Sequence, residues 1–192
     1  MWQQLLPALR INIFFTVLLG LVYPLGMTGI CQLVFPHQAN GSLIGVKGAT
    51  VGSTLIAQGF SKPEYFHPRP SMAGNGYDAT SSGGSNWGPT NKKLIDRVQA
   101  AVDQFRKENP DYRGAIPADL LTASASGLDP DISPDSALVQ ASRVAKARGV
   151  AVEKINDLIA ASTQGPDLGL LGEPRVNVLK LNLALDRQFP HR

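Results

Sequence analysis

The sequence has 192 residues but only one cysteine, Cys31. A single cysteine cannot form a disulfide within the chain, so packing alone must hold the folded part together. Charge is also sparse: 18 Lys and Arg residues stand against 15 Asp and Glu, and the basic residues are scattered along the chain. This pattern lacks the dense basic patch of nucleic-acid-binding proteins, and no nucleic-acid partner is expected.

The region 11–35 contains no Asp, Glu, Lys or Arg. A helix needs about 20 apolar residues to cross the ~30 Å hydrocarbon core of a membrane, and this run is long enough. A cleaved secretory signal is the alternative, but its apolar part has only about 7–15 residues and ends at a small-x-small site. Val34-Phe35-Pro36-His37 offers no such site. We predict one uncleaved membrane-spanning helix over 11–35, kinked at Pro24.

The charges that flank this run predict its orientation. Arg10 precedes it, and the first basic residue beyond its other end is Lys47. Because positive residues favour the cytoplasmic side, we expect residues 1–10 inside the cell and residues 36–192 outside it. The roughly 155 residues after the helix match one domain of ordinary size.

That outer domain is predicted to be α+β, with a small sheet and several helices. A short strand is expected over 52–58, where small, β-branched and apolar residues lie between glycines. The region 63–89 is rich in Gly, Ser, Pro and Asn and predicts a long loop. It also holds several aromatic residues, so we expect an ordered loop packed on its own domain or on a partner.

Helical patterns dominate the second half. One helix is predicted from Thr90-Asn91 to just before Asn109-Pro110, with an apolar stripe that includes Ile95 and Phe105. Another should begin at Ser133-Pro134 and stop at Gly149, and a third should follow it closely. The segment 176–186 fits either a helix or a strand, and its Leu, Ala, Lys and Arg content favours a helix.

Fragments of catalytic motifs occur, but none has the context that its chemistry requires. Gly74-Asn75-Gly76 matches the glycine spacing of a dinucleotide site but lies within the predicted loop, and the region 82–86 lacks the lysine of a phosphate-binding loop. The three histidines are far apart and have no thiol at ligand spacing. The sequence predicts no catalytic residues, no metal site and no firmly bound cofactor.

Several blocks nevertheless resemble one known family, the C subunit of the bacterial Kdp potassium-transporting P-type ATPase. The blocks cover nearly the whole chain in the family's order; they are Tyr23-Pro24-Leu25, residues 38–44, 65–71, 82–86, 121–129 and 143–148, Val176-Asn177-Val178, and residues 183–186. Each block alone is weakly specific, whereas the ordered set is highly specific.

The resemblance implies a non-catalytic subunit in the bacterial inner membrane, in contact with membrane lipid. Its expected partners are a channel-like A subunit that selects potassium, an ATP-hydrolysing B subunit and a small F subunit. Potassium would be handled by the complex as a whole. The subunit would be needed for assembly and transport.

Two finer roles are attached to the family. One is an outer cap or filter at the potassium entrance. The other is a catalytic chaperone that raises the affinity of the B subunit for ATP through a transient complex of B, C and ATP. Under that alternative ATP becomes a possible ligand, and Gln140 is the nucleotide-contact candidate carried over from the resemblance. Gln140 also fits the ordinary role of a helix amide that is solvated or caps a neighbour.

The expected outward orientation favours the cap, because ATP is cytoplasmic. Aromatic and Arg side chains often anchor interfaces, so two loops become candidates for partner contact, with packing inside their own domain as the alternative. The candidate residues are Tyr65, Phe66, His67, Arg69, Ser71, Ser82, Gly83, Gly84, Ser85 and Asn86.

Overall fold

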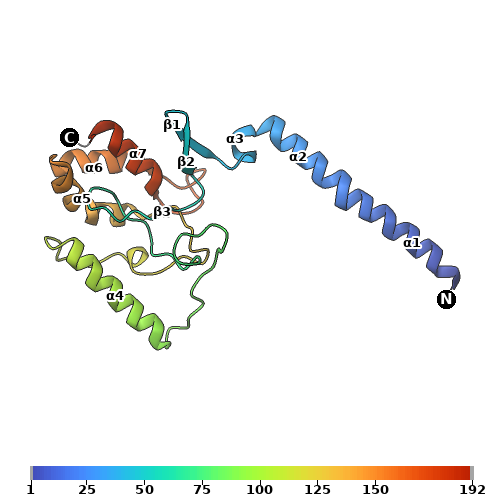
Figure 1. Cartoon of the computed structure of the whole chain (residues 1–192), viewed down its shortest axis with the longest axis horizontal. Coiled ribbons are helices and arrows are strands. Elements are labelled where there is room, and N and C mark those ends of the chain that lie inside the picture. Colours follow the sequence, from blue (N-terminus) through green and yellow to red (C-terminus); the bar gives the residue numbers. More distant parts are fainter. Residues whose placement is uncertain (1, 191–192) are drawn as a thin grey trace. The chain divides into compact units, whose positions relative to one another are not determined.

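The structure is a computed structural model that describes residues 2–190. The chain divides between Val51 and Gly52 into two compact units, the first dominated by one long helix and the second by helices around a small sheet (Figure 1). The predicted combination of an N-terminal apolar helix and an α+β domain is confirmed.

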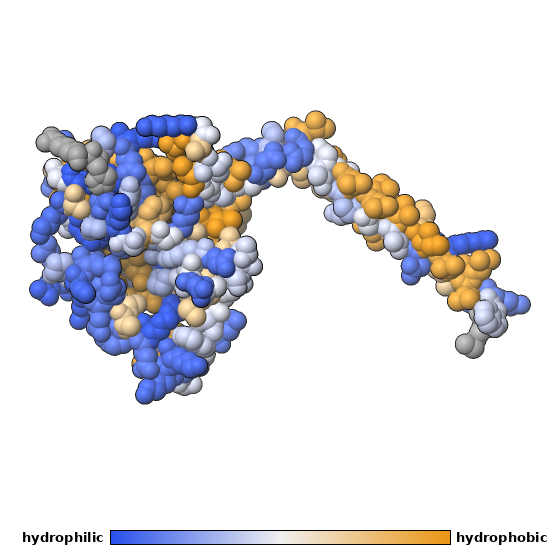
Figure 2. All heavy atoms as spheres, in the orientation of Figure 1, coloured by the Kyte–Doolittle hydropathy of each residue, from blue (hydrophilic) through white to orange (hydrophobic). Residues whose placement is uncertain are grey.

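The apolar helix runs without a break from Trp2 to Val34 as α1 (Trp2–Val17), the π-helical η1 (Leu18–Val22) and α2 (Tyr23–Val34). The helix also includes Trp2 to Arg10, so it extends beyond the predicted membrane span 11–35 on the N-terminal side. It is long and apolar enough to cross a membrane, and its most apolar window is entirely unburied in the chain (Figure 2). These properties suit a helix whose surroundings are lipid or other protein.

Pro24 distorts this helix through the π-helical turn that precedes it. A proline inside a helix lacks an N–H, and its ring collides with the carbonyl four residues earlier. The N–H of Tyr23 bonds to the carbonyl of Leu18, five residues back, so the turn before the proline is widened. The helix therefore passes through Pro24 without ending.

The helix is followed by α3 (Pro36–Ala39), β1 (Leu43–Val46) and β2 (Ala49–Ser53). The strands form a two-stranded sheet, and the turn between them places Lys47 and Gly48 at φ angles of 50° and 83°. Two successive positive φ angles are typical of a type I′ hairpin. The strand predicted over 52–58 is largely wrong, because the Ser53 hydroxyl accepts the Leu55 N–H at 3.1 Å and the chain turns there.

The second unit contains eight further elements. They are α4 (Lys92–Glu108), η2 (Ala118–Leu120), β3 (Asp131–Ile132), α5 (Pro134–Arg148), α6 (Val152–Ser162), β4 (Thr163–Gln164), β5 (Arg175–Asn177) and α7 (Val178–Gln188). The strands are antiparallel in the order β3-β5-β4. Figure 1 shows α5, α6 and α7 gathered together, while α4 lies apart from them.

Local signals set the ends of these helices as predicted. The side chain of Asn91 accepts the Lys93 N–H at 2.9 Å, and Ser133 accepts the Ser136 N–H at 3.1 Å. Gly149 ends α5 in the left-handed conformation, at φ 64°. The ambiguous segment begins as the end of strand β5 and then becomes helix α7, which Asn177 caps by accepting the Lys180 N–H.

The core of the second unit lies between α5, α6, α7 and the sheet. Its buried residues are Phe66, Ile132, Ala137, Ala141, Val144, Ala145, Ile155, Leu158, Ile159, Val176, Val178, Leu181 and Leu185. Helix α4 adds little to it: Phe105 is buried, but Ile95, which the predicted stripe placed on the buried face, is 57% exposed. The long loop 54–90 supplies Phe66 to this cluster of buried residues, whereas α4 supplies none of the residues in the cluster.

Candidate functional site

The loop segment 63–67 is held by side chains in place of a neighbouring strand. Each of its five carbonyl oxygens accepts a hydrogen bond from a side chain of α5 or α7. The bonds run from Arg143 Nη1 to Pro63 O (2.6 Å) and Tyr65 O (2.9 Å), from Arg148 Nε to Glu64 O (3.0 Å), from Asn182 Nδ2 to Phe66 O (3.0 Å) and from Gln140 Nε2 to His67 O (3.1 Å). We call this arrangement the carbonyl clasp.

Two amides in the clasp also accept the backbone N–H groups of the loop. Asn182 Oδ1 accepts from Phe66 at 2.9 Å, and Gln140 Oε1 accepts from His67 at 2.8 Å. Each amide thus pairs with both backbone groups of one residue, as a neighbouring strand does in a sheet. The Phe66 side chain is fully buried in the core. Phe66 is therefore part of the domain interior, and it does not offer a surface for a partner.

Gln140 has no unused hydrogen-bonding capacity. Besides its bonds to His67, its Oε1 accepts from Arg143 Nη2 at 2.7 Å and its Nε2 donates to Ser136 O at 3.0 Å. A glutamine amide offers two donors and two acceptor lone pairs, so all four are occupied. The residue is 1% exposed. A nucleotide could reach this side chain only after the loop had left the clasp.

Tyr65 is tied to α5 and α7 as well. The Arg148 guanidinium lies 4.9 Å from the centre of the Tyr65 ring and bonds to Asp186 Oδ1 at 2.7 Å. The Tyr65 hydroxyl donates to Asp186 Oδ2 at 3.1 Å. Burial and the neighbouring Asp186 raise the pKa of Tyr65. Tyr65 therefore belongs to the attachment of the loop to its own domain.

The ring of His67 faces oxygen acceptors on both sides. Its Nδ1 lies 3.2 Å from Glu108 Oε2, and its Nε2 lies 3.1 Å from Lys62 O. The bond from His67 lowers the pKa of Glu108. This contact connects the loop to the end of α4.

Beyond the clasp, Arg69 and Ser71 hold the loop against the region 127–129. Arg69 Nη1 bonds to Asp129 Oδ2 at 2.8 Å. The Ser71 hydroxyl donates to Gly127 O at 2.6 Å and accepts the Tyr77 N–H at 2.8 Å. Burial raises the pKa of Tyr77 to about 12. Each predicted contact residue from 65 to 71 thus makes an interaction inside its own unit.

The second candidate loop, 82–86, is attached along one edge only. Gly83 N–H and the Ser82 hydroxyl both donate to Ser126 O at 2.9 Å. A Cβ at Gly84 would lie 2.8 Å from Ala125 O, so the backbones pack closely there. Ser82 and Asn86 are exposed, while Gly83, Gly84 and Ser85 are partly buried. This loop therefore keeps an open surface.

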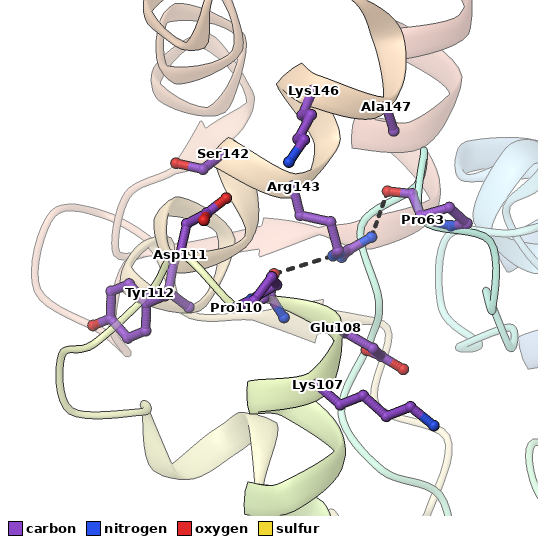
Figure 3. Close-up of a pocket in the computed structure, with 12 residues that line it drawn as sticks. Pro63, Lys107, Glu108, Pro110, Asp111, Tyr112, Ser142, Arg143, Lys146 and Ala147 are labelled. Atoms are coloured by element: carbon purple, nitrogen blue, oxygen red, sulfur yellow. Dashed lines mark hydrogen bonds between the residues drawn. The ribbon is translucent and has the colours of Figure 1, made fainter.

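A pocket of about 290 Å³ lies between the end of α4 and the outer face of α5. Figure 3 shows Lys107 and Glu108 at one side and Arg143 and Lys146 at the other. Arg143 also donates through Nε to Asn109 Oδ1 at 3.1 Å, and burial lowers its pKa. In the described part of the chain, no group of three or more His, Cys, Asp or Glu residues could hold a metal ion.

The candidate residues predicted from the sequence do not include Asn182 and Arg148, which are central to the clasp. Asn182 lies in the apolar stripe of α7, beside Leu181 and three residues before Leu185, both fully buried. A polar side chain at such a position needs a partner, because burying it alone is costly. The sequence around Asn182 therefore indicates that this side chain has a hydrogen-bonding partner, although it does not show which group the partner is.

Comparison with known proteins assigns the family. Residues 5–187 match the family described as "KdpC: K+-transporting ATPase, c chain". The Potassium-transporting ATPase KdpC subunit of Myxococcus xanthus is 56% identical over 190 residues, covering 98% of this chain and 90% of that protein. Those of Caulobacter vibrioides (58% over 191 residues, 99% and 96%) and Rhodospirillum rubrum (54% over 190 residues, 99% and 98%) are similar too. The chain therefore belongs to the KdpC family, the c chain of the potassium-transporting ATPase.

Proposed function

We propose that this chain is a non-catalytic subunit that holds its α+β domain as a cap over the potassium entrance, on the outer face of the bacterial inner membrane. Its partners in this role are the channel-like A subunit, the ATP-hydrolysing B subunit and the small F subunit. The cap acts on the path by which potassium enters.

The distribution of charge around the apolar helix carries this proposal. Arg10 is the only ionised side chain in the described helix Trp2–Val34, and it lies toward the N-terminal end. The next basic residue is Lys47, past the C-terminal end. By the positive-inside rule the N-terminal end stays in the cytoplasm, so the domain from Gly52 onward is outside.

The open surface of the loop 82–86 supports it as the contact with the channel-like subunit. The backbone of this loop is fixed by Ser126 and by its close approach to Ala125, so a partner need not order it on binding. A surface that is already ordered binds with a smaller entropy cost. Ser82 and Asn86 are the exposed residues available for that contact.

The chaperone role has less support. It requires contact with cytoplasmic ATP, and its candidate residue Gln140 uses its full hydrogen-bonding capacity in the clasp. Under the chaperone role, changes in this subunit would alter the KM for ATP. Under the cap role, they would alter the dependence on potassium.

The experiment measures ATP hydrolysis by the purified complex against potassium and against ATP. Ser82→Arg places a long charged side chain on the open surface, and Ala100→Arg, at an exposed position of α4, is the matched control. We expect Ser82→Arg to weaken assembly or raise the KM for potassium, with the KM for ATP unchanged. A changed KM for ATP with normal potassium dependence would favour the chaperone.

A further inference from the structure

The connection between β4 and β5 carries the most exposed large apolar side chains in the described part of the second unit. Leu168 is 91% exposed, Leu170 is 87% exposed, and Leu171 beside them is 61% exposed. Single exposed leucines are common on protein surfaces, whereas a group of exposed apolar side chains marks an interaction site. We call residues 166–172 the leucine loop.

The leucine loop is ordered by hydrogen bonds between its own backbone groups. Asp167 and Leu171 exchange their N–H···O bonds at 2.8 and 2.9 Å and so close the base of the loop. The N–H groups of Gly169 and Leu170 bond to Pro166 O at 3.0 Å and to Asp167 O at 3.2 Å. The three successive N–H groups of residues 169–171 therefore need no water, which lowers the cost of moving them into a less polar medium.

The backbone of Leu168 is held in an unfavourable conformation. Its φ angle is 54°, in the left-handed region that residues with a Cβ rarely adopt. The nearly complete exposure of this side chain means that no buried contact within the chain compensates for the strain. Strained residues that persist in a fold are concentrated at functional sites. The strain at Leu168 therefore agrees with a role for the exposed loop.

The composition of the loop favours a lipid surface over a protein partner. Residues 165–174 contain no aromatic residue and no Lys or Arg. Protein interfaces depend most on Trp, Tyr and Arg, and leucine is under-represented among their energetically important residues. Asp167 is the only charged residue within the loop, and Arg175 bonds to both of its carboxylate oxygens, at 3.3 and 3.4 Å. The loop thus offers apolar surface and a paired charge, which suits the boundary between headgroups and acyl chains.

A membrane is within reach of this loop. The apolar helix ends at Val34, and only residues 35–51 connect it to the second unit. A helix that crosses the bilayer holds the second unit near the lipid at a high effective concentration. A loop with weak affinity of its own can then still bind the lipid surface.

We propose that the leucine loop inserts Leu168, Leu170 and Leu171 into the membrane that holds the apolar helix, at the boundary between headgroups and acyl chains. This contact gives the α+β domain a second attachment to the bilayer. The attachment depends on three side chains, so the loop exchanges between inserted and free states, and a thiol placed in it still reacts with a water-soluble reagent. The contact is possible on either face of the membrane, so this proposal and the cap can fail separately.

The test uses the assembled ATPase complex in vesicles of zwitterionic phosphatidylcholine. A fluorescent amino acid replaces Leu171, and the vesicles are prepared with and without lipids brominated in the upper part of the acyl chain, which quench a fluorophore only at close range. Leu168→Ser and Leu170→Ser remove apolar surface at positions that are almost fully exposed, so the fold is kept. Leu138→Ser, at an exposed leucine of α5, is the matched control.

We expect the brominated lipids to quench the fluorophore at position 171 equally at low and at high salt, because the contact is apolar. Each of the two loop variants should lower the ratio of inserted to free loop about tenfold, the ratio that ~1.4 kcal/mol of lost apolar burial produces. The control should leave that ratio unchanged.

An unquenched fluorophore would overturn the proposal. If its emission is nevertheless shifted to the blue, a protein surface covers the loop in place of lipid. Quenching that Leu168→Ser and Leu170→Ser leave intact would also overturn it, because the leucines would then not be the inserted groups.

Discussion

Asn182 and Phe66 are separated by 116 residues, yet the side chain of one pairs with both backbone groups of the other. Asn182 Oδ1 accepts the Phe66 N–H at 2.9 Å, and Asn182 Nδ2 donates to Phe66 O at 3.0 Å. Gln140 does the same for His67, the next residue. Two helices thereby fix a loop that has no strand beside it.

Removing this amide should destabilise the domain. Asn182→Ala leaves the buried N–H and carbonyl of Phe66 without partners, and each unsatisfied group costs about 1–3 kcal/mol. We expect a loss of roughly 2–4 kcal/mol in the free energy of unfolding, measured by urea denaturation of the full chain in mild detergent. Lys180→Ala, on the exposed side of the same helix, should change it by less than about 0.5 kcal/mol. Similar small effects from both variants would show that the clasp contributes little.

Gln140→Met separates a structural role from a nucleotide role. Methionine fills a similar volume but cannot make the four hydrogen bonds, so the domain should lose stability by about 2–4 kcal/mol. Once the variant complex is assembled, its KM for ATP should equal that of the wild type. An altered KM for ATP together with normal domain stability would instead assign Gln140 to nucleotide contact.

The contact between His67 and Glu108 predicts a pH effect. The pKa of Glu108 is lowered in the folded state, chiefly by the bond from His67. A carboxyl group with a lowered folded pKa stabilises the fold above its unfolded pKa, near the ordinary value of 4.5, and this contribution is lost as the pH falls through the folded pKa. Unfolding midpoints measured between pH 7 and pH 3 should therefore fall more for the wild type than for Glu108→Gln. Parallel decreases in the two proteins would contradict this assignment.

Two glycines with similar backbone angles should respond differently to alanine. Gly127 has φ 67°, and a Cβ there would lie 2.6 Å from Ala73 N and 2.7 Å from Gly83 O. Gly149 has φ 64°, and a Cβ there meets nothing within 4 Å. We expect Gly149→Ala to cost about 1–2 kcal/mol from the left-handed conformation alone, and Gly127→Ala clearly more. Calorimetric unfolding of both variants measures the difference, which should vanish if Ala73 and Gly83 do not pack against Gly127.

Elements with local signals were predictable from the sequence. Ser133 with Pro134 marks the start of α5, and Gly149 marks its end. The run without charged residues marks the apolar helix. The carbonyl clasp was not predictable in the same way. Its bonds join segment 63–67 to side chains 73–116 residues away, and no periodic pattern within the loop encodes such pairs.

The apolar helix and the candidate contact residues also combine features that the sequence predicts with features that it does not. Length and apolarity predict a spanning helix, but the π-helical turn depends on how the backbone accommodates Pro24. Aromatic composition correctly indicates an ordered loop at 63–89. It does not distinguish a buried Phe66 from a surface anchor, because the core and interfaces use the same residue types.

The orientation of the chain in the membrane is the most direct test of the proposed cap role. In a Cys31→Ser background, Leu168→Cys places a thiol in the second unit, at a residue that is 91% exposed. Gln4→Cys places a thiol near the N-terminal end of the apolar helix. A membrane-impermeant maleimide is added to intact spheroplasts and, separately, to lysed ones. If the domain caps the outer face, Leu168→Cys is labelled before lysis and Gln4→Cys only after lysis. Labelling of Gln4→Cys before lysis, with Leu168→Cys protected until lysis, would place the domain in the cytoplasm and contradict the cap.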